Sequence, residues 1–184
     1  VSFYNGTNKK NIYPTPVIGG IGLIKKLSSP LNHKFKMNNS SIILIGKTFG
    51  HLEQSCFLKE NYSITEGMPP EINLLNEKNN GESLLKLIDK DLILSSHDIS
   101  SGGLITSLCE MTISSEFGAK IHKPKRLTDL IKYFFGEDQA RYIIEIKTSN
   151  LPKVEKILKD NDIYYENIGF TQKKDFEIEG ELKI

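Results

Sequence analysis

The sequence has only two cysteines in 184 residues, and this scarcity limits the kinds of site that it can build. Two thiols cannot form a metal cluster by themselves. Cys56 and Cys109 each fall within an apolar pattern of helical spacing. We therefore expect both to be small buried hydrophobic residues of a cytoplasmic protein, where thiols stay reduced.

The sequence also lacks features that nucleic-acid-binding and membrane proteins usually show. The formal net charge is +1 at pH 7, and the lysines are spread along the chain rather than gathered in a stripe. No apolar run approaches the roughly 20 residues that span a bilayer, and the first ten residues lack the apolar core of a signal peptide. We expect no nucleic-acid partner and no membrane partner.

No Walker A sequence, no GxGxxG in a βαβ frame and no HExxH is present, so the common signatures of nucleotide and zinc sites are missing. What is present is the composition of a globular protein, with 38% hydrophobic and 26% charged residues. A chain of this length and composition can bury a substantial core.

Strands and helices are expected to alternate along most of the chain, which is typical of an α/β layered domain. Residues 1–4 are expected to end a strand and residues 5–11 to form a turn. Apolar runs predict further strands at 14–24, 41–46, 118–122, 141–146, 163–170 and 176–178. Helical spacing predicts helices at 51–60, 72–89, 127–135 and 152–160. Leu84, Leu85 and Ile88 are the expected buried stripe of the helix at 72–89, and Gly81 leaves open whether it is one helix or two.

The stretch LILSSHDISSGGLITSLCEM, residues 92–111, predicts a strand, a tight turn and a helix in that order. Gly102–Gly103 lets the backbone approach a ligand or another segment closely. The free N–H groups of the helix point back at the turn and make a ready anion site. His97 beside Asp98 fits either an acid–base or metal-ligating pair or a turn, and spacing alone favours the turn. Ser100 and Ser101 are candidate helix caps.

Three further positions carry polar side chains of interest. Glu137, Asp138 and Gln139 precede a strand, and such a junction holds a cation or a hydroxylated ligand, or is simply an acidic turn. Glu110 is expected opposite the apolar face of its helix, in solvent. His33 is expected in a solvated loop.

Five segments occur in one order along the chain: VSFYN, PTPVIGGIGLI, SSHDISSGGL, LCEM and FGEDQARYIIEI. Together they resemble the C-terminal part of the phosphoribosylformylglycinamidine synthase family, a relative of aminoimidazole ribonucleotide synthetase. The resemblance implies that residues 1–27 end a second nucleotide-binding domain. It implies that residues 28–184 form an α/β domain with a layered mixed sheet and flanking helices. Since the chain starts on a strand pattern without Met, we expect a piece of a longer protein.

The resemblance implies an ATP-dependent carbon–nitrogen ligase of purine biosynthesis. Its reaction converts formylglycinamide ribonucleotide and glutamine-derived ammonia to the amidine, with ATP and Mg²⁺ as cofactors. The implied partners are the rest of the synthetase chain, a glutaminase subunit or domain and a small accessory subunit. Two alternatives stay open: a structural or docking domain of that enzyme, and a related enzyme such as aminoimidazole ribonucleotide synthetase. The 184 residues alone are expected to be inactive.

Site residues follow from the same resemblance, position by position. The family's G-N-V-S segment implies a substrate contact for Ser2, whereas its metal-binding Asn would precede Val1, so no metal ligand is expected here. The family's H-D-x-S-D/E-G-G loop implies a phosphate- or nucleotide-facing role for five residues, with Ser101 where an acid is usual. Those five are His97, Asp98, Ser100, Gly102 and Gly103.

The substrate-binding E-S-Q triplet of the family's first half corresponds to Glu137-Asp138-Gln139, which implies a pseudo-site at Glu137 and Gln139. No catalytic residue is expected within the chain.

Overall fold

A computed structural model of the chain describes residues 5–7, 10–12, 19–23, 31–126 and 129–184. The chain divides into two compact units, residues 1–30 and 31–184. In the first unit, β1 (Asn5–Thr7) and β2 (Lys10–Ile12) pair as an antiparallel hairpin, where only a turn was expected. Residues 19–23 form no strand and are exposed, so the strand expected at 14–24 is wrong there. Residues 1–4, including Ser2, lie outside the described residues, and the assignment of 1–27 to a neighbouring domain stays a prediction.

The second unit is built on one seven-stranded mixed sheet with the strand order β4-β6-β3-β7-β5-β8-β9. Strands β5 and β8 are parallel, and the other neighbouring strands are antiparallel. This confirms the predicted α/β class with a layered mixed sheet. The strands are β3 (Ser41–Ile45), β4 (Ser95–Asp98), β5 (Gly118–Ile121), β6 (Tyr142–Ile146), β7 (Tyr165–Gln172), β8 (Phe176–Ile178) and β9 (Leu182–Lys183). The helices are α1 (Cys56–Tyr62), α2 (Leu74–Asp89), α3 (Gly103–Ile113), α4 (Leu130–Phe135) and α5 (Leu151–Asp160), with a 3₁₀ turn η1 (Thr148–Asn150).

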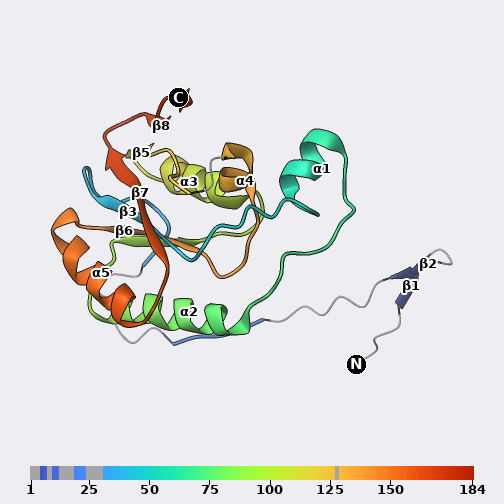
Figure 1. The fold of residues 1–184 in the computed structure, drawn as a ribbon, viewed down its shortest axis with the longest axis horizontal. Coiled ribbons are helices and arrows are strands. Elements are labelled where there is room, and N and C mark those ends of the chain that lie inside the picture. The colour runs from blue at the N-terminus through green and yellow to red at the C-terminus, as the bar shows by residue number, and fades with distance from the viewer. Residues whose placement is uncertain (1–4, 8–9, 13–18, 24–30, 127–128) are drawn as a thin grey trace. The chain divides into compact units, whose positions relative to one another are not determined.

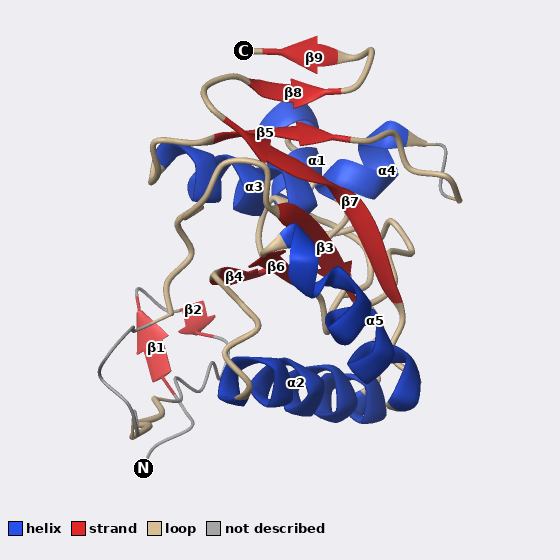
Figure 2. Ribbon diagram, turned by 90° about the vertical axis from the view of Figure 1, so that its left-hand side faces the viewer, coloured by secondary structure: helices blue, strands red, loops and turns tan. Residues whose placement is uncertain are grey.

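Helices cover both faces of this sheet, as Figures 1 and 2 show. The central strand β3 reads SIILI, a continuous apolar run rather than an alternating one. Ile42 and Leu44 belong to the core shared with α3 and α4, and Ile43 and Ile45 to the core shared with α2 and α5. A strand buried on both faces needs apolar residues at every position, which explains the run.

Helix α1 begins at Cys56 rather than at the expected residue 51. Ser55 sets this start, because its side chain accepts a hydrogen bond from the N–H of Leu58. Cys56 is therefore an exposed residue, and the expectation that both cysteines are buried is wrong for it. Cys109 is partly buried, and both thiols are free.

Helix α2 is a single helix that continues through Gly81. Its inward side differs from the expected stripe, because Leu87 is fully buried whereas Leu85 is exposed. Asn80 and Ser83 are the other buried residues of the helix. Among the described residues, none of the helices has the length and apolar character needed for a membrane crossing.

Strand β4 starts at Ser95, after the apolar residues that were expected to form it. His97 and Asp98 thus end a strand instead of lying in a turn. Gly102 is the N-cap residue of α3 with a left-handed backbone (φ +81°), and it has no side chain of its own to cap the helix. The prediction that Ser100 or Ser101 caps the helix is therefore wrong.

Glu145 in β6 is a fully buried carboxylate that hydrogen bonds hold in place. One oxygen accepts from the N–H of Met37 at 3.0 Å and the hydroxyl of Ser40 at 2.6 Å. The other accepts from the N–H of Lys36 at 2.8 Å and the hydroxyl of Ser95 at 2.7 Å. Four donors compensate for the lost hydration of the charge, and they fasten the 36–40 loop and β4 to the central sheet.

Candidate functional site

Glu137 joins the two sites that the sequence placed apart. Its Oε1 accepts hydrogen bonds from the N–H of Gly102 at 2.7 Å and from the N–H of Cys56 at 2.8 Å. These donors lie at the starts of α3 and α1, where free N–H groups and the helix dipole favour negative charge. The chain therefore places its own carboxylate at the predicted anion position. An incoming phosphate at Gly102 would meet the charge of Glu137, and the phosphate-facing role of this loop stays a prediction.

Packing explains the two glycines at the start of α3 without any ligand. Gly103 has φ +72°, and a Cβ there would lie 2.7 Å from the carbonyl oxygens of Phe134 and Gly136. A Cβ on Gly102 would collide with the side chain of Thr106. The Gly-Gly pair thus allows α3 to begin directly against the end of α4.

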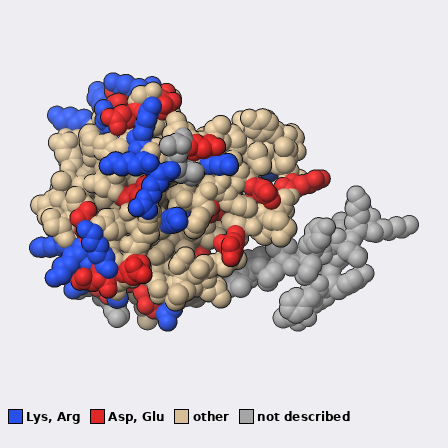
Figure 3. Space-filling model, in the orientation of Figure 1, with Lys and Arg blue, Asp and Glu red and all other residues tan. Residues whose placement is uncertain are grey.

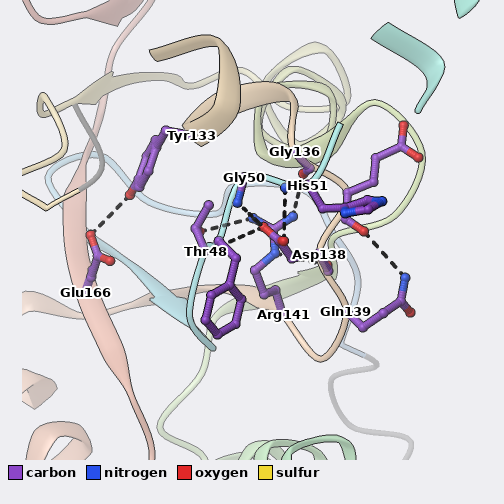
Figure 4. A network of polar contacts seen from close by, with 11 residues as sticks. Thr48, Gly50, His51, Tyr133, Gly136, Asp138, Gln139, Arg141 and Glu166 are labelled. Carbon is purple, nitrogen blue, oxygen red and sulfur yellow. Dashed lines mark hydrogen bonds and ion pairs between the residues drawn. The ribbon is translucent and has the colours of Figure 1, made fainter. Parts of the chain in front are cut away.

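Asp138 holds the loop that follows β3, as the close view in Figure 4 shows. Its carboxylate accepts from three consecutive N–H groups: Phe49 at 2.9 Å, Gly50 at 2.8 Å and His51 at 3.1 Å. The side chain is nearly inaccessible to solvent. Because a carboxylate accepts from several N–H groups at once, one residue fixes the path of the whole 49–51 segment.

Arg141 lies beneath the same loop and is fully buried. It donates to the carbonyl oxygens of Asp138 at 3.1 Å and Gly136 at 2.6 Å, and to the Thr48 hydroxyl at 3.1 Å. Burial lowers the pKa of the Arg141 guanidinium, and the nearby Asp138 charge opposes that shift. The buried cation and anion, 3.9 Å apart, clasp the loop to the start of β6.

A cleft of about 340 Å³ opens beside this clasp. Side chains with aromatic, imidazole, amide and carboxylate groups line it, and the described lining contains no Lys or Arg. They include Phe49, His51, Glu71, Asn73, Asn76 and Gln139. Such a lining suits a neutral polar group better than a phosphate, because it offers no cation to a negative charge.

His97 lies between two carboxylates. Its Nδ1 is 3.2 Å from Asp98 and its Nε2 is 2.9 Å from Glu110, so both ring nitrogens are engaged. Glu110 is exposed, as predicted, yet its carboxylate pairs with His97. His33, expected in solvent, instead contacts the Ser114 hydroxyl at 3.0 Å and faces the His97 ring. Within the part of the chain that the structure describes, no three His, Cys, Asp or Glu side chains are placed to hold a metal ion.

The structure thus brings Glu137 to Gly102 and places Gln139 in the cleft, with His97 and Asp98 at the end of β4 and Ser100 in the turn before α3. Sequence reasoning missed the 48–51 loop. A usable signal was Gly50, in a polar loop directly after a fully buried strand.

The sequence of the second unit matches a known class of domain. The family described as "AIR synthase related protein, C-terminal domain" matches residues 39–180, which is most of the chain. The chain belongs to this family.

Curated relatives that match the chain over its whole length are subunits of one enzyme. The chain is 45% identical over all 184 residues to "Phosphoribosylformylglycinamidine synthase subunit PurL" of Pelagibacter ubique, and 38% identical to its counterpart from Rhodopseudomonas palustris. It spans about a quarter of the length of each of these relatives (25%). Solved structures show the same fold. PurL of Thermotoga maritima complexed with ATP has a TM-score of 0.65 at 13% identity, covering 86% of this chain and 27% of that one. Thiamine-monophosphate kinase of Stenotrophomonas maltophilia has a TM-score of 0.59 at 13% identity, covering 84% and 54%.

Proposed function

We propose that this chain is the C-terminal part of a phosphoribosylformylglycinamidine synthase and acts in purine biosynthesis. The observation that carries the proposal is the 45% identity to the Pelagibacter ubique relative, which extends over every residue of the chain. A solved PurL of the same fold is complexed with FGAR, and another with ATP. These ligands support formylglycinamide ribonucleotide and ATP as the substrates of the whole enzyme.

The proposed reaction activates an amide oxygen by phosphoryl transfer from ATP. Ammonia, released from glutamine by a glutaminase subunit or domain, then displaces the phosphate and leaves the amidine, ADP and phosphate. Mg²⁺ would neutralise the charge of the transferring group. The described residues do not fit these groups, because Glu137 fills the start of α3 and no cation-binding cluster is formed. We therefore assign the ATP and Mg²⁺ sites to other parts of the enzyme.

In this proposal the chain acts as a scaffold that docks against other parts of the enzyme and positions them. Glu137, Asp138 and Arg141 all form hydrogen bonds with loop and helix groups of the same chain, which suits a rigid scaffold. A purely structural or docking domain is the second candidate function, and the internal carboxylate at Gly102 favours it. Direct substrate contact by Ser2, a cytoplasmic location and binding of a small accessory subunit belong to the proposal as well.

Reconstitution tests the proposed function. The part of the Pelagibacter ubique relative that precedes the matching quarter is co-expressed with this chain, and amidine formation is measured with formylglycinamide ribonucleotide, ATP, Mg²⁺ and ammonia. We expect no turnover from either part alone and clear turnover from the two together. A stable complex without turnover would contradict the synthase assignment.

Two variants of the reconstituted enzyme separate scaffold from ligand contact. His97→Ala and Gln139→Ala should leave turnover within roughly twofold if this chain only docks, since their side chains then touch no substrate. A large fall in kcat with the complex intact would instead assign those residues to a ligand.

A further inference from the structure

The cleft beside the Asp138 clasp has the size of a small-molecule site and walls that are held in place. Its volume of about 340 Å³ lies within the range of roughly 300–1,000 Å³ that is usual for such sites. One wall is the 49–51 loop, which Asp138 holds by three hydrogen bonds. Another is the start of α2, which the side chain of Asn73 caps. Walls that keep their shape before a ligand arrives reduce the entropic cost of binding.

One residue of the lining has a strained backbone. Ala140 has φ +57°, in the left-handed region that residues with a side chain rarely adopt. Its carbonyl oxygen accepts a hydrogen bond from the side-chain amide of Asn80 in α2 at 2.8 Å, and Asn80 is only 7% exposed. The buried amide thus holds the strained turn, and the turn places the preceding residue, Gln139, in the lining. Strain that the surrounding structure maintains is typical of ligand-binding sites.

Polar side chains of the lining offer hydrogen bonds to a ligand. The Gln139 amide has a long contact of 3.5 Å from its Nε2 to a backbone carbonyl oxygen (Figure 4), which leaves its own oxygen available. Glu71 and Asn76 are exposed at the cleft. His51 Nε2 lies 2.9 Å from the carbonyl oxygen of Met68, so a neutral imidazole donates there and keeps Nδ1 as an acceptor. The lining therefore provides both donors and acceptors.

An aromatic ring completes the lining. Phe49 is 65% exposed, although its backbone N–H is fixed by Asp138. The ammonium group of Lys47 lies over this ring, 5.0 Å from its centre, and does not line the cleft. An exposed aromatic ring beside amide groups is the combination that binds a nucleobase, because the face of the base stacks while its edge donates and accepts hydrogen bonds.

The charges at the cleft disfavour a phosphate. Its described lining contains the carboxylates of Glu71 and Asp138 but no Lys or Arg. On the face turned to the viewer in Figure 3, Lys and Arg lie interspersed with Asp and Glu rather than gathered into a basic patch. The negative charge of Glu71 would repel a phosphate at this short range. An uncharged ligand avoids that cost.

We propose that this cleft binds an uncharged molecule that contains a nucleobase, either the free base or its nucleoside. The ring of Phe49 lies against the face of the base, and the amides of Gln139 and Asn76 bind its edge. Such a ligand differs from ATP and from the ribonucleotide substrate of the proposed reaction, because both of these carry phosphate. The inference therefore goes beyond the proposed function and does not depend on it.

Titration of the 184-residue chain with adenosine, followed by two-dimensional NMR, tests the site. We expect saturable shifts of the amide signals of residues 49–51 and 139–140. Phe49→Ala should weaken adenosine binding about tenfold because stacking is lost, and Gln139→Ala about fivefold because an edge hydrogen bond is lost. The matched control is Tyr62→Ala, a 60% exposed aromatic residue outside the lining, which should change the Kd less than about twofold. Melting curves should be alike for all proteins, since the substituted side chains are exposed.

Comparison of related ligands tests the charge argument. AMP should bind about tenfold more weakly than adenosine, and Glu71→Gln should reduce that ratio because it removes a negative charge from the lining. Adenine and uridine are titrated in the same way. Equal affinities of adenine and adenosine would identify the free base as sufficient, and a higher affinity of adenosine would identify the nucleoside. Either result supports the proposal.

Three results would overturn the proposal. The first is the absence of saturable shifts with adenosine, adenine and uridine up to about 10 mM. The second is an affinity for adenosine that Phe49→Ala and Gln139→Ala leave unchanged, which would place the ligand elsewhere. The third is tighter binding of AMP than of adenosine, which would make the cleft a phosphate site. These measurements require no turnover, so a failed synthase assignment is seen separately from a failed ligand site.

Discussion

Glu137→Ala is the most informative single substitution, because one carboxylate serves two helix starts. The change leaves the N–H groups of Gly102 and Cys56 without their acceptor. Loss of an N-terminal cap costs about 1 kcal/mol per helix. The free energy of unfolding should therefore fall by about 2 kcal/mol for the two helix starts together.

Urea denaturation followed by circular dichroism measures this loss. Glu137→Gln separates charge from geometry, since the amide oxygen can still accept both hydrogen bonds. It should lose only about 1 kcal/mol, the value of a negative charge near helix N-termini. The matched control is Glu116→Ala, which removes an exposed carboxylate after α3 and should change the free energy by less than about 0.5 kcal/mol.

Phosphate binding gives a second, independent readout of the same variant. Removing Glu137 uncovers the N–H groups at the start of α3, so added phosphate or sulfate should raise the melting temperature of Glu137→Ala more than that of the unchanged protein. Equal stabilisation of both proteins by phosphate would refute the argument that Glu137 fills the anion position. A loss below about 0.5 kcal/mol in Glu137→Ala would refute the double-capping role.

Substitutions at three further residues test the buried polar groups. Arg141→Met removes three hydrogen bonds under the 48–51 loop and should lower the free energy of unfolding by about 3 kcal/mol in urea titrations, an expectation that an unchanged midpoint would contradict. Glu145→Gln turns an amide NH₂ toward fixed donors and should lower the free energy of unfolding by about 3 kcal/mol. Glu145→Asp keeps the charge but should also be less stable than the unchanged protein. Burial, and next the charge of Glu166, raise the pKa of the Tyr133 hydroxyl. The folded state then holds this proton more tightly than the unfolded state. The free energy of unfolding is therefore unaffected below about pH 10, where Tyr133 is protonated in both states. Above that pH it falls by about 1.4 kcal/mol per pH unit, because the unfolded state loses the proton first. Tyr133→Phe should remove that part of the slope between about pH 10 and about pH 11.5, and an unaltered slope would argue against it.

Apolar patterning predicted the central part of the fold correctly. Strand β3 was expected at 41–46 and occupies Ser41–Ile45, and α5 was expected at 152–160 and occupies Leu151–Asp160. Each of these two patterns fits only one kind of element. The sequence of β3 is a short apolar run typical of a strand buried on both faces, and that of α5 has helical spacing with Pro in the first turn.

The apolar pattern gave a wrong prediction wherever two neighbouring apolar residues could each have been the buried one. In α2 both Leu85 and Leu87 fit a helical stripe, and only the position of α5 and the sheet decides that Leu87 is inside. The strand after Leu92 starts three residues late, because the N–H of Leu92 still donates to the carbonyl oxygen of Leu87 in α2. Pairing with β6 begins only at Leu94, whose N–H donates to the carbonyl oxygen of Glu145. Propensity carries no information about such distant partners.

The candidate site shows the same limit in its chemistry. The residue types were identified correctly as an acidic group and a Gly-Gly helix start, separated by 33 residues of sequence between Gly103 and Glu137. No local sequence feature indicates that Glu137 reaches Gly102. The helix start and the carboxylate that occupies it were therefore predicted as two separate candidate sites. A helix start that looks open in a sequence is an anion site only if no carboxylate of the same chain reaches it, and this depends on the packing of α3 against α4. For this chain the geometry explains Gly102–Gly103 as a joint between α3 and the end of α4, with the carboxylate of Glu137 at the anion position.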